Sequence, residues 1–166
     1  MNKKFIADFT LLLVVFVWGS TFVIVQDAIS FLTPFSFNAI RFFIAFVILL
    51  SIYMIFTKKD KLHFTKDSIK SGFVIGTWLC FGYGFQTFGL LYTTPAKAGF
   101  ITGLSVVLVP LFSFLLLKYA LNRNIILGVI FTAAGLYMMT TMQTSSFSIG
   151  DFLVLLCAVS FAMHII

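Results

Sequence analysis

The amino-acid sequence predicts an all-α protein, a polytopic transmembrane helix bundle with about five full helices and a partial sixth. Of its 166 residues, 61% are apolar and only 10% are charged, whereas a soluble domain is about one quarter charged. The apolar residues also form runs of roughly twenty, a length that crosses a hydrocarbon core of about 30 Å. We therefore expect an integral membrane protein.

The expected spans alternate with polar or helix-breaking segments. They cover residues 8–26, 35–56, 69–91, 96–117 and 124–142, and a sixth apolar run extends from Asp151 to Ile166. That last run is short for a span. Pro110 lies inside the fourth span, where it lacks an N–H donor and predicts a bend.

The positions of lysine and arginine predict the orientation of the bundle. The segments before the first helix, between the second and third, and between the fourth and fifth hold nine such residues, whereas the opposite side holds only Lys97. Because positive charge marks the cytoplasmic side, we expect a cytoplasmic N-terminus in the plasma membrane of a bacterial cell. The same pattern accounts for the net charge of +6, so we expect no nucleic-acid partner.

Small residues indicate where helices pack closely, because helices in lipid associate through close contact rather than through expulsion of water. The third expected helix has Gly72 and Gly76 four residues apart and then Gly82, Gly84 and Gly89, and the fourth has Gly99 and Gly103 four residues apart. We expect these two helices to pack closely against their neighbours. The two cysteines lie within apolar runs, and we assign them no function.

The first and last apolar runs are weakly similar. Aligning Asp8 with Asp151 pairs several apolar residues and also pairs Trp18 with Phe161. The offset of 143 residues between them spans five expected helices, and five is odd, so a second copy of the pattern would start on the opposite face of the membrane. This inverted arrangement is typical of many secondary transporters.

Four motifs occur in an order that points to one family. Residues 18–22 read WGSTF, residues 34–42 read PFSFNAIRF, GLLYTTPAKAGFITGLSVVLVPLFSFLL begins at residue 89, and GDFLVLLCAVSFAMHI begins at residue 150. In this order and spacing the motifs resemble the EamA-like family of the drug/metabolite transporter superfamily. The resemblance covers nearly the whole chain.

The resemblance implies ten helices in two inverted repeats. Residues 1–145 would form the first EamA-like five-helix repeat, and residues 146–166 the incomplete start of the second. The chain has Phe161 where the family usually has Trp, and it stops within an apolar run, so we interpret it as truncated. A second transporter half would come from the same gene product, if full length, or from a separate chain. The charge bias disfavours an identical inverted partner.

Six residues are candidates for contact with a substrate: Trp18, Thr21, Arg41, Tyr83, Gln86 and Lys97. Arg41 and Lys97 are cations in or beside spans, where charge is costly unless it is functional or paired, although either could reach the outer headgroups. Gln86 and Tyr83 lie on nearly one helix face, and Gln86 could instead bond another helix. Trp18 would stack on a substrate or pack in the core, and the WGSTF stretch would line a cavity or contact a helix.

The resemblance implies a secondary transporter, an exporter or exchanger that moves a small metabolite or drug by alternating access. Its partners would be that small-molecule substrate, the lipid bilayer and the second half. The alternative is a non-transporting membrane partner subunit or a nonfunctional remnant. An enzyme is not expected, because the chain has no Glu and no paired Asp, HExxH or Ser/His set. We expect no cofactor and no metal.

Overall fold

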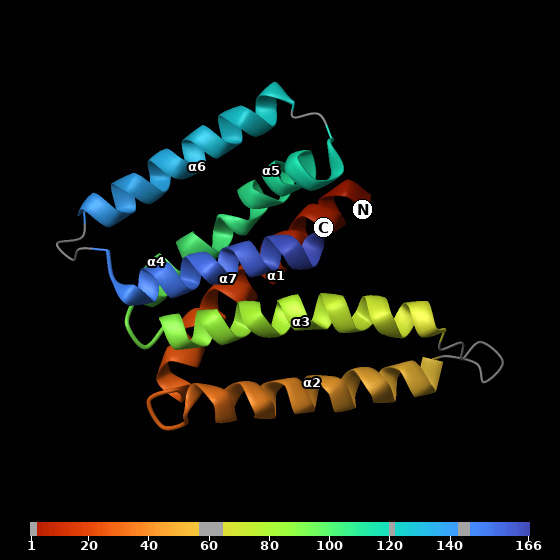
Figure 1. Cartoon of the computed structure of the whole chain (residues 1–166). Coiled ribbons are helices and arrows are strands. Elements are labelled where there is room, and N and C mark those ends of the chain that lie inside the picture. The colour runs from red at the N-terminus through yellow and green to blue at the C-terminus, as the bar shows by residue number, and fades with distance from the viewer. Residues whose placement is uncertain (1–2, 57–64, 120–121, 143–146) are drawn as a thin grey trace.

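The computed structural model describes residues 3–56, 65–119, 122–142 and 147–166. Within these ranges every regular element is a helix, which confirms the predicted all-α fold (Figure 1). The helices are α1 (Lys3–Ala28), α2 (Pro34–Phe56), α3 (Lys66–Gly89), α4 (Pro95–Gly103), α5 (Ser105–Leu117), α6 (Arg123–Met142) and α7 (Ile149–Ile165).

Three described helical stretches are long and apolar enough to cross a membrane. They are Lys4–Ala28, Pro34–Phe56 and Pro95–Leu117, the last of which combines α4 and α5. The helix α3 is as long, but it begins with Lys66, Asp67 and Lys70. Lengths of this kind match the thickness of a hydrocarbon core and support an integral membrane protein.

The fourth expected span differs from the single helix that its sequence predicts. Leu104 divides it into α4 and α5, and the N–H of Leu104 bonds to Ile101 O, three residues back, at 3.0 Å. Pro110 lies further along, inside α5, where it cannot donate to the carbonyl of Val106 and crowds that carbonyl. A tightened turn therefore lies just upstream of the proline.

The helix α7 is the most enclosed helix of the bundle. It packs mainly against α3 and also against α4 and α5, and Figure 1 shows it between α3 and α5. Two glycines make this contact possible. A Cβ on Gly89 would lie 2.6 Å from Val154 Cγ2, and a Cβ on Gly82 would overlap the ring of Phe161. The backbone of α3 therefore approaches α7 more closely than any larger residue would permit.

Of the four glycines with four-residue spacing, most do not lie at a helix contact. A Cβ on Gly72, Gly76 or Gly103 would meet no atom within 4 Å in the described structure. Gly99 alone is near another helix, since its Cβ would lie 3.7 Å from the ring of Phe22. The prediction of close packing is therefore confirmed at Gly82, Gly89 and Gly99 and wrong inside this bundle at Gly72, Gly76 and Gly103, because spacing along one helix does not say which face meets a neighbour.

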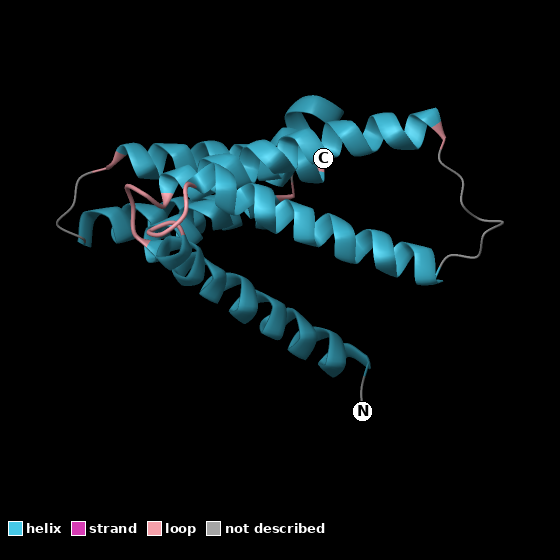
Figure 2. Ribbon diagram, turned by 90° about the horizontal axis from the view of Figure 1, so that it is seen from below, coloured by secondary structure: helices cyan, strands magenta, loops and turns pink. Residues whose placement is uncertain are grey.

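The bundle has a closed end and a spread end. The closed end contains residues 29–33, 90–94 and 147–148, where α1 and α3 end and α4 and α7 begin. The spread end contains the starts of α1 and α3 and the ends of α2, α5 and α7, and the helices diverge there (Figure 2). By the predicted topology, the closed end faces outward and the spread end faces the cytoplasm.

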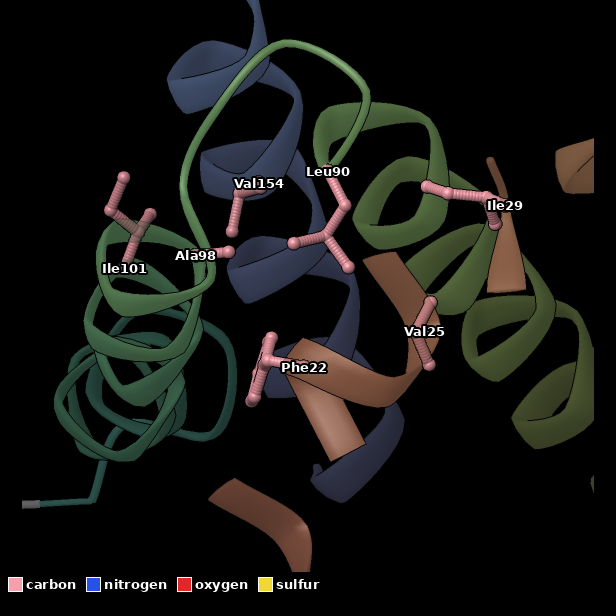
Figure 3. Packing of buried hydrophobic residues seen from close by; sticks show 7 residues of the cluster. All are labelled: Phe22, Val25, Ile29, Leu90, Ala98, Ile101 and Val154. Atoms are coloured by element: carbon pink, nitrogen blue, oxygen red, sulfur yellow. The ribbon is translucent and has the colours of Figure 1, made fainter. Parts of the chain in front are cut away.

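The main apolar core lies at the closed end. Figure 3 shows its side chains converging from α1, α4, α7 and the loop after α3. The members of this cluster are Phe22, Val25, Ile29, Leu90, Ala98, Ile101 and Val154. Close packing of these side chains fixes the ends of three helices relative to one another, and it places the polar residues of α4 and α7 side by side.

Candidate functional site

A buried ion pair joins α4 to α7 at the closed end. Lys97 Nζ lies 3.6 Å from Asp151 Oδ2, and the two side chains are 4% and 0% exposed. The other carboxylate oxygen, Oδ1, accepts a hydrogen bond from the hydroxyl of Thr93. The backbone N–H of Ser148 donates to Oδ2 at 2.9 Å. The carboxylate of Asp151 therefore has partners on both oxygens, as a buried charge requires.

Local helix signals bring these two charges together. Thr94 caps α4 and Pro95 is its first residue, which places Lys97 in the first turn of the helix. Ser148 and Asp151 form a capping box at the start of α7. The N-terminal end of a helix disfavours a cation and favours an anion. Lys97 therefore lies where it needs a counter-charge, and Asp151 provides one.

A glutamine of α1 ties the same region to a third helix. Gln26 Nε2 donates to Leu90 O at 2.9 Å and to Thr93 O at 3.0 Å, both in the loop between α3 and α4. The hydroxyl of Thr93 in turn bonds Asp151. A continuous set of polar contacts thus links α1, the loop and α7, and it closes this end of the bundle together with the apolar core.

Polar side chains deeper in the bundle connect α3 to its neighbours. Gln86 Nε2 donates to Thr102 Oγ1 of α4 at 3.3 Å, and Thr87 Oγ1 donates to Asn38 Oδ1 of α2 at 3.2 Å. All four side chains are buried. The contact of Gln86 is the interhelical bond that its sequence left as an alternative to substrate binding.

Tyr83 is the centre of an aromatic cluster with a cation beside it. The guanidinium carbon of Arg41 lies 4.2 Å from the centroid of the Tyr83 ring, the geometry of a cation–π contact. The ring also meets Phe42 and Phe161 edge to face, at centroid distances of 5.6 Å and 5.1 Å. Two predicted site residues, Arg41 and Tyr83, are therefore in direct contact.

Two adjoining hollows lead from the spread end toward Tyr83. The larger, about 570 Å³, lies between the start of α3 and the end of α7, with Asp67 and Lys70 in its wall. The smaller, about 160 Å³, is lined by Trp18, Tyr83, Ser105 and Phe161, among others. His164 and Ile165 line both hollows. Their combined size is in the range of small-molecule sites.

The ring of His164 is held at the junction of the two hollows. Its N–H donates to Ile75 O of α3, and the Nδ1 to oxygen distance is 3.1 Å. Because the carbonyl can only accept, this contact orients the imidazole and leaves its second nitrogen for another partner.

The six predicted residues do not converge on one point. Trp18 and Tyr83 line the small hollow, whereas Thr21 and Arg41 line a separate apolar groove of about 430 Å³ between α1 and α2. Tyr83 connects these two places, because its ring contacts Arg41. Gln86 and Lys97 are buried toward the closed end, each in contact with another helix.

The predicted site residues did not include Asp151, His164 or Ser105. Asp151 had a usable signal, since Ser148 precedes it by three residues and the pair reads as a capping box. His164 lies in the last apolar run, which was interpreted as an incomplete span, so His164 was not chosen as a site residue. Ser105 carries no sequence signal. A cluster of three or more potential metal ligands does not occur among the described residues.

The helices, their apolar surfaces and their buried polar contacts define a helical integral membrane protein. The chain belongs to the EamA-like transporter family, whose model matches residues 5–141. This membership confirms the resemblance seen in the motifs, and it places the chain among transporters rather than enzymes.

Named relatives support the same assignment. The chain is 41% identical over 164 residues to an uncharacterized transporter of Archaeoglobus fulgidus, a match that covers 98% of this chain and 49% of that protein. It is 29% identical over 153 residues to the uncharacterized transporter YyaM of Bacillus subtilis, covering 88% of this chain and 50% of YyaM. The chain thus spans about half the length of these curated relatives. No solved structure matches it significantly.

Proposed function

We propose that this chain is one half of a secondary transporter that exports or exchanges a small metabolite or drug by alternating access in the plasma membrane of a bacterial cell. Residues 1–145 would be its first inverted repeat, and residues 146–166 the beginning of the second. The observation that carries this proposal is the contrast between the two ends. The closed end is sealed by the Lys97–Asp151 pair, while hollows reach Tyr83 from the spread end.

This contrast corresponds to an inward-facing state of an alternating-access cycle, if the N-terminus is cytoplasmic as the charge pattern predicts. Opening the closed end would require α4 and α7 to separate. The contacts that must then break are the Lys97–Asp151 pair and the apolar packing in which Ala98 and Ile101 of α4 share one cluster with Val154 of α7. Water can replace the partners of the ion pair when the end opens, whereas the apolar residues lose their packing.

The substrate would bind between Trp18 and Tyr83. The two rings offer apolar faces for stacking, Arg41 lies against Tyr83, and Ser105 and His164 supply hydrogen bonds. This set suits a small anionic or zwitterionic metabolite with an apolar part. In this proposal Gln86 and Lys97 would meet the substrate only in the outward-open state, and Thr21 would act from the neighbouring groove.

Uptake into proteoliposomes tests the proposal. The vesicles would contain this chain together with the half of the archaeal relative that it does not match, and a pool of amino acids and organic acids would be offered outside. We expect at least one compound to accumulate. Trp18→Ala should lower its rate by about tenfold, the effect of about 1.4 kcal/mol of lost binding.

Phe16→Ala is the matched control, because Phe16 is an exposed aromatic residue on the same helix; its rate should equal the parental rate. If the two halves assemble normally and no compound is transported, the alternative of a non-transporting partner subunit or a nonfunctional remnant holds instead.

A further inference from the structure

His164 is the one ionisable side chain, among the described residues, that lines both hollows at the spread end. The larger hollow also contains Asp67 and Lys70, and the smaller one contains Tyr83. Ile165 is the other residue that the two walls share. A molecule that moves from the larger hollow into the smaller one therefore passes the imidazole of His164.

The small hollow contains no lysine, arginine or aspartate among its described lining residues. Apart from His164, its wall consists of apolar and aromatic side chains with the hydroxyls of Tyr83 and Ser105. Arg41 contacts the Tyr83 ring, but it lines the separate groove between α1 and α2. His164 is thus the one side chain of this wall that can become positively charged, and an ammonium group would find no carboxylate there.

The imidazole can change its charge without losing the contact that orients it. Nδ1 lies 3.1 Å from Ile75 O of α3. Because a carbonyl only accepts, Nδ1 carries a hydrogen and Nε2 carries the lone pair. No described residue bonds Nε2. A proton that Nε2 takes up from water in the hollow leaves the bond to Ile75 intact and creates a second N–H donor.

The charged groups that face His164 lie toward the mouth of the larger hollow. Helix α3 contributes Asp67 and Lys70, one of each sign, and the carboxyl group of Ile166 lies two residues beyond His164. Both α3 residues precede Ile75 by more than one helical turn. The side chains with which α1 and α5 line the small hollow, Trp18 and Ser105, are uncharged. The charge deep in this path is therefore set by His164.

We propose that His164 binds the carboxylate of a small apolar acid in its imidazolium form, so that one proton enters the site with each substrate molecule. The proposal rests on the transport function proposed above, and it narrows the substrate to monocarboxylates with an apolar or aromatic part. Trp18 and Tyr83 stack on that part, while the new N–H of Nε2 donates to the carboxylate.

The proton and the carboxylate each strengthen the binding of the other. A hydrogen bond between two charged groups is about twice as strong as one between neutral groups, and coupling between two ligands is reciprocal. Histidine suits this role because its charge changes between about pH 5 and 8. A lysine or arginine would hold the carboxylate at every pH, whereas His164 releases it when the proton leaves.

Binding of benzoate in detergent tests the proposal. The assembly of this chain with the unmatched half of the archaeal relative would be purified, and the Kd of benzoate measured at pH 6 and at pH 8. Benzoate remains ionised at both values, so a change in affinity comes from the protein. We expect binding to be about tenfold tighter at pH 6, the effect of a hydrogen bond that becomes charge-assisted. Benzamide, which has the same ring and no charge, should bind equally at both values.

His164→Asn is the main variant, because an asparagine amide can donate to Ile75 O in place of Nδ1 but does not titrate. It should bind benzoate at both pH values with the parental affinity at pH 8. His63→Asn is the matched control, since His63 is the other histidine of the chain; it lies outside the described residues, and its variant should keep the parental pH dependence. If His164→Asn lowers the unfolding temperature, His164→Gln replaces it with the same expectation.

Proton uptake gives a second readout on the same proteins. In weakly buffered solution near pH 7, the parental assembly should take up protons as benzoate binds, and His164→Asn should take up none. Equal parental Kd values at pH 6 and pH 8, a pH dependence that persists in both His164 variants, or no benzoate binding by the assembled parent would each overturn the proposal.

The two proposals can fail separately, because this experiment measures binding without transport. Binding that depends on pH, without uptake of any compound into vesicles, would contradict the transporter and leave the role of His164 intact. Uptake together with binding that does not depend on pH would contradict only the role of His164.

Discussion

Lys97 of α4 and Asp151 of α7 form an ion pair, 3.6 Å from Nζ to Oδ2, with both side chains buried. They are 54 residues apart in the chain, and they fasten together the first turns of two helices that both begin at the closed end. The pair therefore fixes the position of α4 relative to α7, and its loss should weaken the packing of the two helices.

Removing one partner of this pair should destabilise the protein. Asp151→Asn leaves the buried ammonium of Lys97 without its counter-charge, which costs about 3–5 kcal/mol. The double variant Lys97→Met with Asp151→Asn also removes the ammonium charge of Lys97, so it should recover part of the lost stability. Thermal unfolding of the parent, the two single variants and the double variant in detergent measures the coupling free energy between Lys97 and Asp151. Strictly additive effects of the two substitutions would show that the residues do not act as a pair.

Gly89 should tolerate no side chain. Gly89→Ala places a Cβ 2.6 Å from Val154 Cγ2 and 2.9 Å from Gly150 O, so α3 and α7 must move apart at a cost of about 1–3 kcal/mol. The measurement is again the unfolding temperature of the purified protein.

Gly84→Ala is the control within the same helix, because its Cβ would meet nothing within 4 Å. Its stability should be unchanged or slightly higher, since Ala favours helix over Gly by up to about 1 kcal/mol. Equal losses in the two alanine variants would mean that the α3–α7 contact is looser than described.

The buried contact between Gln86 and Thr102 should contribute a smaller amount. Thr102→Val keeps the shape of the side chain but removes the oxygen that accepts from Gln86, and a single interhelical hydrogen bond in a membrane protein is worth about 1 kcal/mol. Thr10→Val is the comparison, because the exposed Thr10 hydroxyl bonds only within its own helix, to Ile6 O. A loss with Thr102→Val no larger than with Thr10→Val would argue against this bond.

Cysteine labelling tests the predicted orientation. In a background with Cys80→Ala and Cys157→Ala, Tyr92→Cys places a thiol at the closed end and Tyr119→Cys places one after α5; both tyrosines are exposed. A membrane-impermeant maleimide should label position 92 in intact cells and position 119 only after permeabilisation. The reverse pattern would place the N-terminus outside.

The sequence predicted the helices well because their signals are strong. Long apolar runs and the breaks between them depend on local composition, so the bounds of α2 were predicted to within a residue or two. The division of the fourth span at Leu104 was not predicted. Pro110 predicts that the helix bends, but it does not predict in which turn the helix is interrupted. The glycines of α3 predicted that it packs closely, but they did not show which of them meet another helix. Gly82 and Gly89 do, whereas Gly72 and Gly76 do not.

The candidate site was predicted only in part, for a related reason. Arg41, Tyr83 and Trp18 were recognisable because polar or aromatic residues are costly or distinctive at their depth, and the structure brings the first two into contact. The partner of Lys97 is an aspartate more than fifty residues away, at the start of another helix. Only the packing of α7 against α4 makes them neighbours, and no pattern along either helix encodes that packing.

The enclosed position of α7 has a consequence for biogenesis. The ribosome synthesises α3 and α4 before α7. During that interval α7 does not yet pack against Gly82 and Gly89, and Asp151 is not yet beside Lys97. Without its counter-charge, the lysine ammonium has its lowest free energy in the hydrated membrane interface. We therefore expect the first turn of α4 to reach its final depth in the membrane only when α7 inserts. Insertion of α7 is then the step that completes the closed end.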